Sequence, residues 1–256
     1  MARLRFASLG SGSRGNATLV QAGDTLLLVD CGFPARELER RCRTLGIDPT
    51  RIDAILVTHE HGDHVRGVGV GARRFGIPVW MTPGTGLALA DEVLPQRHLF
   101  GSHAGPFTIG DLTVEPFAVP HDAREPVQFV FRTGACRFGM LTDTGSLTPH
   151  LVASLADVDA LLLECNHDPE LLAAGPYPPS LQARVGGDYG HLANGQAAQL
   201  LARIDHARLR HLVAGHLSEK NNTPGHVRQA LGRVGGQLGE RAALLCQDAA
   251  SPWFEL

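Results

Sequence analysis

Four residues with metal-binding side chains lie together in the segment VTHEHGDHVRG, residues 57–67. His59, His61, Asp63 and His64 fall within six positions. They match neither the alternating apolar pattern of a packed strand nor the spacing of a packed helix. Imidazole and carboxylate groups at this density indicate a metal site. Nitrogen and oxygen donors without thiolate suit zinc, manganese or iron, so these residues leave the identity of the metal open.

Other polar residues stand at the ends of short apolar runs, in the way that His59 does. They are Asp30, Asp143, Glu164 and His216, and His121 follows a further run. In layered α/β proteins the ends of strands deliver rigidly placed side chains to a common edge. We therefore expect these dispersed residues to converge on the His59–His64 segment.

The elements that must position these residues follow from hydrophobic periodicity. Apolar runs predict strands at 25–30, 52–58, 77–82, 112–119, 127–133, 136–143, 159–165, 209–216 and 242–246. Helical patterns predict helices at about 34–46, 65–75, 148–156, 193–206 and 223–236. The segment 174–190 is rich in proline and glycine and is expected to be a long, functional loop. This alternation predicts an α/β or α+β layered protein with helices on its outer faces.

Composition is that of an enzyme-sized globular protein. The chain has 256 residues, 43% of them hydrophobic, which is enough for one large domain or two small ones. The five cysteines are odd in number and form no C-x-x-C pair, so a reducing compartment is expected. No apolar run approaches the roughly 18 residues of a membrane span, and the N-terminal segment has no signal-peptide core. We expect a cytoplasmic protein that does not enter a membrane.

The charged residues allow two interpretations. The net charge of −3 gives no global reason to expect nucleic acid. However, Arg36, Arg40, Arg41, Arg43 and Arg51 gather in one segment, and the planar guanidinium group matches phosphate. These arginines could form a phosphate-binding track, or they could be solvated helix faces paired with Glu37, Glu39 and Asp48.

The segment THEHGDH, which follows an apolar run and precedes a helical pattern, resembles the H-x-H-x-D-H motif of metallo-β-lactamase fold hydrolases. Further segments of that family's pattern occur in the expected order: VDCG before this motif, and VPHDA, LTDTG and AGHLSEKNN after it. The resemblance implies a four-layer αββα fold, two mixed sheets with outer helices, and a single domain over residues 1–256. It implies two divalent metal ions, zinc or manganese. One would be bound by His59, His61 and His121 and the other by Asp63, His64 and His216, with Asp143 touching both and Asp30 bracing the site.

More specific segments, among them SLGSGSRGNATLV, ECNHD and HLSEKNNTP, resemble the YycJ/WalJ family of exonuclease-like proteins. This implies a dinuclear metal-dependent phosphodiesterase, most narrowly a 5′→3′ DNA exonuclease that uses a metal-bridging hydroxide and serves DNA repair. The expected partner is nucleic acid, in particular DNA; the oligomeric state is left open. The alternatives are a small-molecule phosphodiester or thioester hydrolase of the same fold, RNase Z-like RNA processing, and a regulator without activity.

A candidate proton donor lies outside the metal set. The segment GHLANGQAA resembles the helix-opening segment of RNase Z, which places His191 where that family has a histidine. His191 could protonate a departing sugar oxygen, with Glu164 orienting its ring. Asp63, Glu164 and His191 are therefore the candidate catalytic residues. The alternative is that His191 only caps or packs at the start of a helix.

Six further residues are candidates for substrate contact. In SGSRGN, Ser11, Ser13 and Arg14 could hold a phosphate, or the segment could be a plain hairpin turn. Asn166 and His167 in ECNHD, and Asn222 after HLSEK, could touch substrate. Structural hydrogen bonds or a turn would explain them equally.

Overall fold

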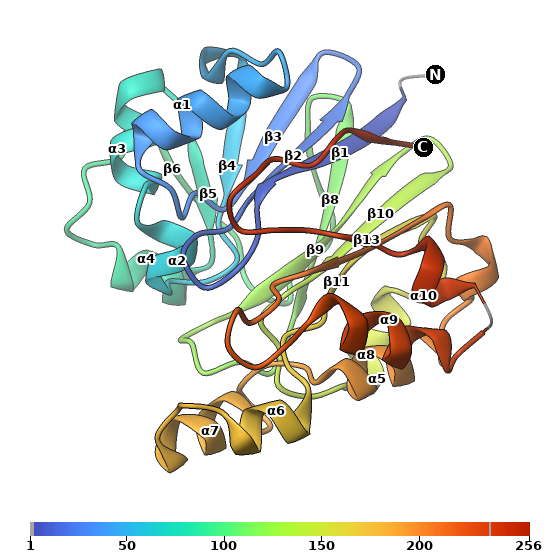
Figure 1. Ribbon diagram of the computed structural model, residues 1–256. Helices are drawn as coiled ribbons and strands as arrows, with labels where there is room; N and C mark the ends of the chain where they lie inside the picture. Colours follow the sequence, from blue (N-terminus) through green and yellow to red (C-terminus); the bar gives the residue numbers. More distant parts are fainter. Residues whose placement is uncertain (1–2, 236) are drawn as a thin grey trace.

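The computed structural model describes residues 3–235 and 237–256, and in these residues two seven-stranded sheets lie face to face (Figure 1). The first sheet has the order β14-β1-β2-β3-β4-β5-β6 and the second the order β13-β12-β11-β10-β9-β8-β7. Each sheet is mixed. Strands β3 to β6 are parallel, as are β10 to β13, and the remaining neighbours pair antiparallel.

The strands of the first sheet are β1 (Leu4–Gly10), β2 (Ala17–Ala22), β3 (Thr25–Val29), β4 (Ala54–Leu56), β5 (Val79–Met81), β6 (Arg97–Leu99) and β14 (Phe254–Glu255). Those of the second are β7 (Phe107–Ile109), β8 (Leu112–Ala118), β9 (Val127–Thr133), β10 (Cys136–Leu141), β11 (Ala160–Glu164), β12 (His211–Gly215) and β13 (Ala243–Leu244).

The helices cover the outer faces of the two sheets (Figure 1). Beside the first sheet are α1 (Ala35–Thr44), α2 (Gly62–Val65), α3 (Val68–Phe75) and α4 (Pro83–Ala88). Beside the second are α5 (Pro149–Ser154), α6 (Pro169–Ala174), α7 (Pro179–Val185), α8 (Asn194–Leu201), α9 (Pro224–Gly232) and α10 (Leu238–Arg241). Short 3₁₀ turns occupy Pro49–Arg51 and His206–Arg208.

The apolar side chains form three layers of core, which explains why central strands such as β3 and β11 are apolar on both faces. In β3, Leu27 and Val29 enter the cluster between the sheets, whereas Leu26 and Leu28 enter the cluster under α1 and α3. Phe6 of β1 and Phe138 of β10 stack between the sheets with ring centroids 3.8 Å apart. A third cluster lies between the second sheet and α5, α8 and α9. The predicted αββα layering is confirmed.

All nine predicted strands lie within the ranges expected, and the five predicted helices correspond to α1, α2 with α3, α5, α8 and α9. Residue 236, the predicted end of the last helix, lies outside the described residues. The expectation of a long loop at 174–190 was wrong, because α7 lies inside it. Pro179 stands at the first position of α7, where a missing N–H costs nothing and a fixed φ favours the helix.

Candidate active site

The candidate residues reach one place because strands of both sheets end there. Asp30 directly follows β3, and His59 follows β4 by three residues. Helix α2 carries Asp63 and His64 and begins three residues before the predicted range of about 65–75. In the second sheet His121 follows β8, Asp143 follows β10, Glu164 ends β11 and His216 follows β12. The site thus lies at the carboxyl ends of parallel strands from both sheets.

The backbone is strained at three of these positions. Asp30, Asp143 and His216 have φ values of 60°, 52° and 54°, and they are the only non-glycine residues with positive φ in the described part of the chain. Such residues cost about 1 kcal/mol or more each and cluster at functional sites. In each case the residue lies within two positions of the end of a strand, and its side chain contacts a histidine or a carboxylate of the cluster.

The structure brings the metal-ligand candidates into two groups of three. The ligand atoms of His59, His61 and His121 lie within 4.8 Å of one another, and so do those of Asp63, His64 and His216. These are the two sets that the resemblance implied. Asp143 groups with His59 from the first set and His64 from the second, which suits a carboxylate placed between two ions.

In each histidine of the two ligand groups, a supporting group contacts one ring nitrogen and thereby orients the other ring nitrogen. The Nδ1 atom of His64 lies 2.7 Å from Asp30 Oδ2, and that of His216 lies 3.0 Å from Glu164 Oε1. The Nδ1 atom of His59 lies 3.0 Å from Thr58 Oγ1. Backbone carbonyls hold the other two rings: Gly190 O lies 3.0 Å from His121 Nδ1, and Asp122 O lies 3.2 Å from His61 Nε2. Metal-binding histidines are supported in this way.

The buried donor atoms that remain fit a cation. The Nε2 atoms of His59 and His216 and the Oδ2 atom of Asp143 are buried and have no hydrogen-bond partner among the described residues. A buried polar atom without a partner is costly, and a metal ion at this place would satisfy all three. The donor set contains nitrogen and carboxylate oxygen but no thiolate; burial raises the pKa of the neighbouring Cys165 thiol.

The electrostatic field of the cluster also favours positive charge. Burial would lower the pKa of His216, but the Asp143, Asp63 and Glu164 carboxylates raise it to about 10. The pKa of Asp143 is lowered well below its ordinary value despite burial, because His216 and His64 flank it. Burial lowers the pKa of His59, whose neutral form is the one that binds metals. The donor atoms and their charges therefore fit divalent metal ions.

His191 and Glu164 form a separate pair beside the two groups. His191 Nδ1 lies 2.8 Å from Glu164 Oε1, and the backbone N–H groups of Thr144 and Leu192 donate to Glu164 Oε2. Burial would raise the pKa of Glu164, but His191 and His216 lower it to about 2. Glu164, His191, Asp143 and His216 also lie close enough to hold an ion. Because Glu164 Oε1 already faces the Nδ1 atoms of both rings, orientation of these histidines is the better interpretation.

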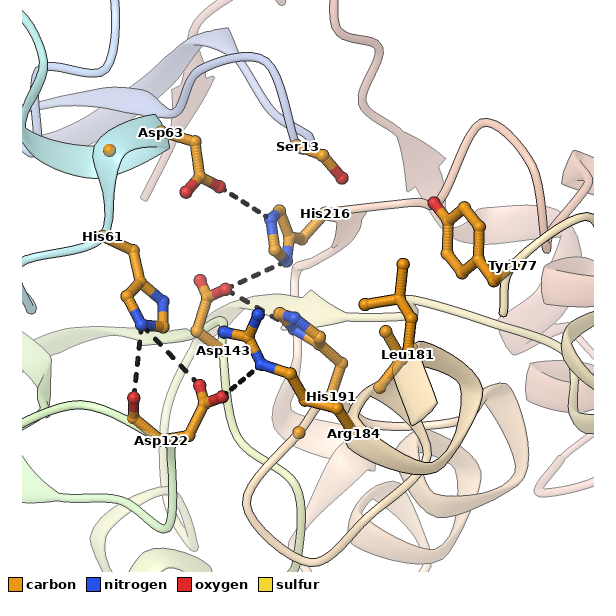
Figure 2. A pocket seen from close by; sticks show the side chains of 13 residues that line it. Ser13, His61, Asp63, Asp122, Asp143, Tyr177, Leu181, Arg184, His191 and His216 are labelled. Atoms are coloured by element: carbon orange, nitrogen blue, oxygen red, sulfur yellow. Dashed lines mark hydrogen bonds and ion pairs between the residues drawn. The ribbon is translucent and has the colours of Figure 1, made fainter. Parts of the chain in front are cut away.

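A cavity of about 370 Å³ opens over the cluster. Its floor includes Asp63, Asp143, His191 and His216, and Figure 2 shows these side chains facing one space. Its wall comes from the segment that was expected to be a loop: Tyr177, Leu181 and Arg184 all line it. Helix α7 therefore shapes the entrance to the site.

The six residues considered for substrate contact occupy different places. Ser13 lines the cavity. Ser11 is buried, and its Oγ accepts the backbone N–H of His216 at 2.8 Å. The Arg14 guanidinium pairs with Glu219 and Asp248. Asn166 Nδ2 donates to His216 O, and Asn222 Nδ2 donates to Cys165 O. His167 lines a second cavity.

These contacts give Ser11 and Arg14 structural roles, and their contact with a phosphate stays a prediction. Ser11 Oγ holds the backbone of His216, and the Arg14 guanidinium forms ion pairs with Glu219 and Asp248. Asn166 and Asn222 form the structural hydrogen bonds that were the alternative for them.

Asn16 is a site residue that the sequence did not reveal, although it ends the quoted SGSRGN segment. Its Nδ2 lies 3.2 Å from Asp63 Oδ2 and 3.1 Å from His64 Nε2. The loop that carries Asn16 is fixed by Gln247: Arg14 N donates to Gln247 Oε1 at 2.7 Å, and Gln247 Nε2 donates to Gly15 O at 2.8 Å. Asparagine in a glycine-rich turn is common, so no pattern marked it.

The arginines of α1 are paired rather than free. Arg40 and Arg41 bond to Glu37, and Arg43 bonds to Glu39. The buried Arg41 also donates to the backbone oxygens of Leu9 and Gln247. The paired-helix interpretation of this segment is therefore confirmed for these three arginines, and a phosphate-binding track over α1 is not supported.

Comparisons with known proteins agree with this geometry. Residues 25–216 match the family model described as Beta-lactamase superfamily domain. The chain is 34% identical over 234 residues to exodeoxyribonuclease YycJ of Bacillus anthracis, covering 90% of this chain and 89% of that protein. It is also 34% identical over 224 residues to exodeoxyribonuclease WalJ of Streptococcus pneumoniae, covering 85% and 83%.

Solved structures share the fold at low identity. The metallo-β-lactamase fold protein YhfI from Bacillus subtilis superposes with a TM-score of 0.76 at 16% identity, covering 99% of this chain and 100% of that one. The short form of human tRNase Z superposes with a TM-score of 0.66 at 16% identity, covering 96% and 98%.

Within residues 3–235 and 237–256, every helix is too short or too polar to cross a bilayer. The match of the domain model to most of the chain, and the alignments with YycJ and WalJ over most of both partners, establish the family and with it the enzyme class. The chain belongs to the beta-lactamase superfamily, in the YycJ/WalJ family, and is a metal-dependent hydrolase.

Proposed function

We propose that this protein is a dinuclear phosphodiesterase that degrades DNA from the 5′ end, and that residues 1–256 act as one domain. The observation that carries the proposal is the pair of ligand groups that share Asp143, with the His191–Glu164 pair beside them. The names of the YycJ and WalJ relatives, both exodeoxyribonucleases, support DNA as the substrate.

Two divalent ions, zinc or manganese, would be held by His59, His61 and His121 and by Asp63, His64 and His216, with Asp143 between them. When bound, such ions activate water and neutralise the charge of a phosphate undergoing displacement. The protein's own contribution is orientation. Asp30, Glu164, Thr58 and backbone oxygens fix the imidazole rings, and Asn16 holds the Asp63 carboxylate.

His191 is assigned as the proton donor. Its Nδ1 bonds to Glu164, so Nε2 is the nitrogen available to a substrate in the cavity that His191 lines. Proton transfer from Nε2 to the departing sugar oxygen would leave an imidazole still held by Glu164. A positioned general acid contributes about 10²–10⁴-fold to the rate.

Arg184 supplies the cation that a phosphate backbone would meet in this cavity. It lies on α7, lines the cavity and bonds through Nε to Asp122 Oδ2 at 2.5 Å, as Figure 2 shows. Neither of its two terminal nitrogens bonds to another residue in the described part of the chain. A planar guanidinium with free donors is suited to a phosphate oxygen.

The segment 177–185, which includes α7, also favours a second candidate function. Tyr177 and Leu181 wall the cavity on one side, and such a wall suits a small phosphodiester as well as the end of a strand. A small-molecule hydrolase would be indifferent to competing DNA.

The test is digestion of end-labelled DNA and RNA by the protein reconstituted with manganese or with zinc, with Asp63→Ala as the blank. Stepwise release from the 5′ end of DNA that is absent in Asp63→Ala is the expected result. Hydrolysis of methyl p-nitrophenyl phosphate without digestion of either strand would move the assignment to small phosphodiesters. Hydrolysis of none of these substrates would overturn the phosphodiesterase proposal.

A further inference from the structure

A second cavity, of about 500 Å³, lies on the other side of α7 from the metal-ligand cluster. It is bounded by α6, by the end of α7 and by the first turns of α8. Within α7, Leu181 and Arg184 line the first cavity, whereas Gln182 lines the second. The helix is therefore a partition between the two spaces.

Residues that line the two cavities are also close to each other in the sequence. His191 lines the first and Ala193 lines the second. Two residues span at most about 7 Å of extended chain. A ligand that reaches His191 with a phosphate could thus place an adjoining group in the second cavity.

The walls of the second cavity carry hydrogen-bonding groups but no charge. Its lining offers three glutamine side chains, one histidine and apolar surface; these residues are Gln182, Gln196, Gln199, His167, Pro169, Leu172, Ala173 and Ala193, with Gly186 and Gly195. This contrasts with the first cavity, where Asp63, Asp122, Asp143 and Arg184 meet. A neutral, mixed lining suits an uncharged planar group rather than a phosphate.

His167 indicates that the second cavity has a ligand. Only 3% of its surface is exposed, yet it lines this cavity. Its Nδ1 lies 3.4 Å from Asn166 Oδ1, and its Nε2 has no hydrogen-bond partner among residues 3–235 and 237–256. That Nε2 points towards Gly186, 3.9 Å from the place a Cβ would occupy there. Burial lowers the pKa of His167, so its ring is a neutral hydrogen-bonding group.

We propose that the second cavity is a nucleobase subsite, which receives a base of the strand whose phosphodiester lies over the metal-ligand cluster. This inference rests on the proposed function and adds to it the group that the enzyme recognises next to the cleaved bond. The Gln196 amide is bonded to Ala193 N and Gly145 O, and Gln182 Nε2 donates to Ala173 O and Gly175 O. The Gln199 amide, Gln182 Oε1 and the neutral His167 imidazole are therefore the groups that can pair with the donor and acceptor edge of a base, and the apolar wall covers its face. With no charged side chain in the lining, the cavity does not select for phosphate.

The variant that tests the nucleobase subsite most directly is Gly195→Leu. Gly195 lines the second cavity in α8, has no positive φ, and a Cβ there would meet no atom within 4 Å. The leucine side chain should fill the cavity without disturbing the fold. The matched control is Gly232→Leu at the end of α9, where a Cβ also meets nothing within 4 Å.

Kinetics separate the subsite from the catalytic machinery. For Gly195→Leu we expect the KM for a DNA oligonucleotide to rise about tenfold or more, because each base contact contributes strongly to single-strand binding. Hydrolysis of methyl p-nitrophenyl phosphate, which has no base, should be unchanged, as should both activities of Gly232→Leu. An unchanged KM for DNA, or an equal loss on both substrates, would overturn the subsite.

A binding experiment tests the nucleobase subsite without measuring enzymatic activity. Titration of the metal-free protein with 2′-deoxyadenosine, followed by amide chemical shifts, should perturb Ala173, Gly186 and Gly195, and Gly195→Leu should abolish the effect. If the same amides respond to inorganic phosphate and ignore the nucleoside, the cavity is an anion site and the inference is wrong. Because this readout needs no hydrolysis, it still decides the subsite if the proposed phosphodiesterase activity is not found.

Discussion

At the scale of single residues, the chemistry depends on which ring nitrogen each histidine has free. Glu164 bonds to the Nδ1 atoms of both His191 and His216, and Asp30 bonds to that of His64. Two buried carboxylates thus set the orientation of three imidazoles. The sequence could indicate these partners only through their positions after apolar runs, and it gave no sign of Asn16.

His191→Ala should separate proton donation from the other steps. We expect kcat for a DNA oligonucleotide to fall about 100-fold or more, because its departing sugar oxygen needs a proton. Methyl p-nitrophenyl phosphate should lose less than about tenfold, since nitrophenolate leaves without one. The measurement is kcat for both substrates with equal metal content.

The matched control for that experiment is His150→Ala, which removes an exposed histidine at the start of α5. It should change neither rate. An equal loss of kcat by His191→Ala on both substrates would remove the proton-donor role and leave His191 as a packing residue.

At the scale of elements, the predicted strands include the three-residue β4 and β5, whereas the longer β1 and β2 were not among the predicted ranges. Strands such as β3 and β11 are apolar on both faces because each face meets its own core cluster, and this made them visible. The three-residue strands β6 and β7 contain polar residues and form no apolar run, whereas the equally short β4 and β5 are wholly apolar. Helix α7 was not predicted because the prolines before and at its first residue are also typical of a loop. Proline is common at the start of a helix, which is where Pro179 lies.

Helix α1 allows a prediction about acid stability. The hydrogen bond from Arg40, together with Arg41 and against the effect of burial, lowers the pKa of Glu37 to about 2. A carboxylate whose pKa is depressed by folding stabilises the protein fully above its ordinary pKa of about 4.3, and this contribution is lost as the pH falls towards 2. Glu37→Gln should therefore destabilise the protein at pH 7 by about 1–2 kcal/mol, between the values for exposed and buried pairs.

Urea unfolding of both proteins at several pH values checks this. The difference in unfolding free energy between wild type and Glu37→Gln should shrink steadily from pH 5 downwards. A difference that stays constant with pH would show that the lost packing of the side chain, and not its charge, is responsible.

At the scale of the whole molecule, strands from opposite ends of the sequence pair with each other. In the first sheet β14 pairs with β1, with Arg5 opposite Glu255. Phe254 stacks on Phe6 with ring centroids 5.0 Å apart, and Phe6 belongs to the core between the sheets. The resemblance to a known family predicted the two sheets but could not predict this closing strand, which is two residues long.

Phe254→Ala should measure how much that pairing stabilises the fold. We expect the free energy of unfolding to fall by about 2 kcal/mol, less than for a fully buried phenylalanine, because Phe254 is only partly buried. Urea denaturation gives the value. The variant Val93→Ala, at a side chain that is 71% exposed, is the control and should change little. A loss below about 0.5 kcal/mol would mean that the pairing of β14 contributes little to the stability of the fold.

The link between Gln247 and the Asn16 loop has a consequence for synthesis of the chain. A ribosome releases His59, His61 and His64 when three quarters of the protein is still unmade, and these side chains could then attract any available metal. Asn16 N donates directly to Asp63 O, but the two hydrogen bonds that hold its loop from the other side can form only after Gln247 emerges, nearly two hundred residues later. Because His216 and Gln247 are both made late, the nascent protein should pass most of its synthesis as a metal-binding but inactive chain, and an interrupted translation product should have no hydrolase activity.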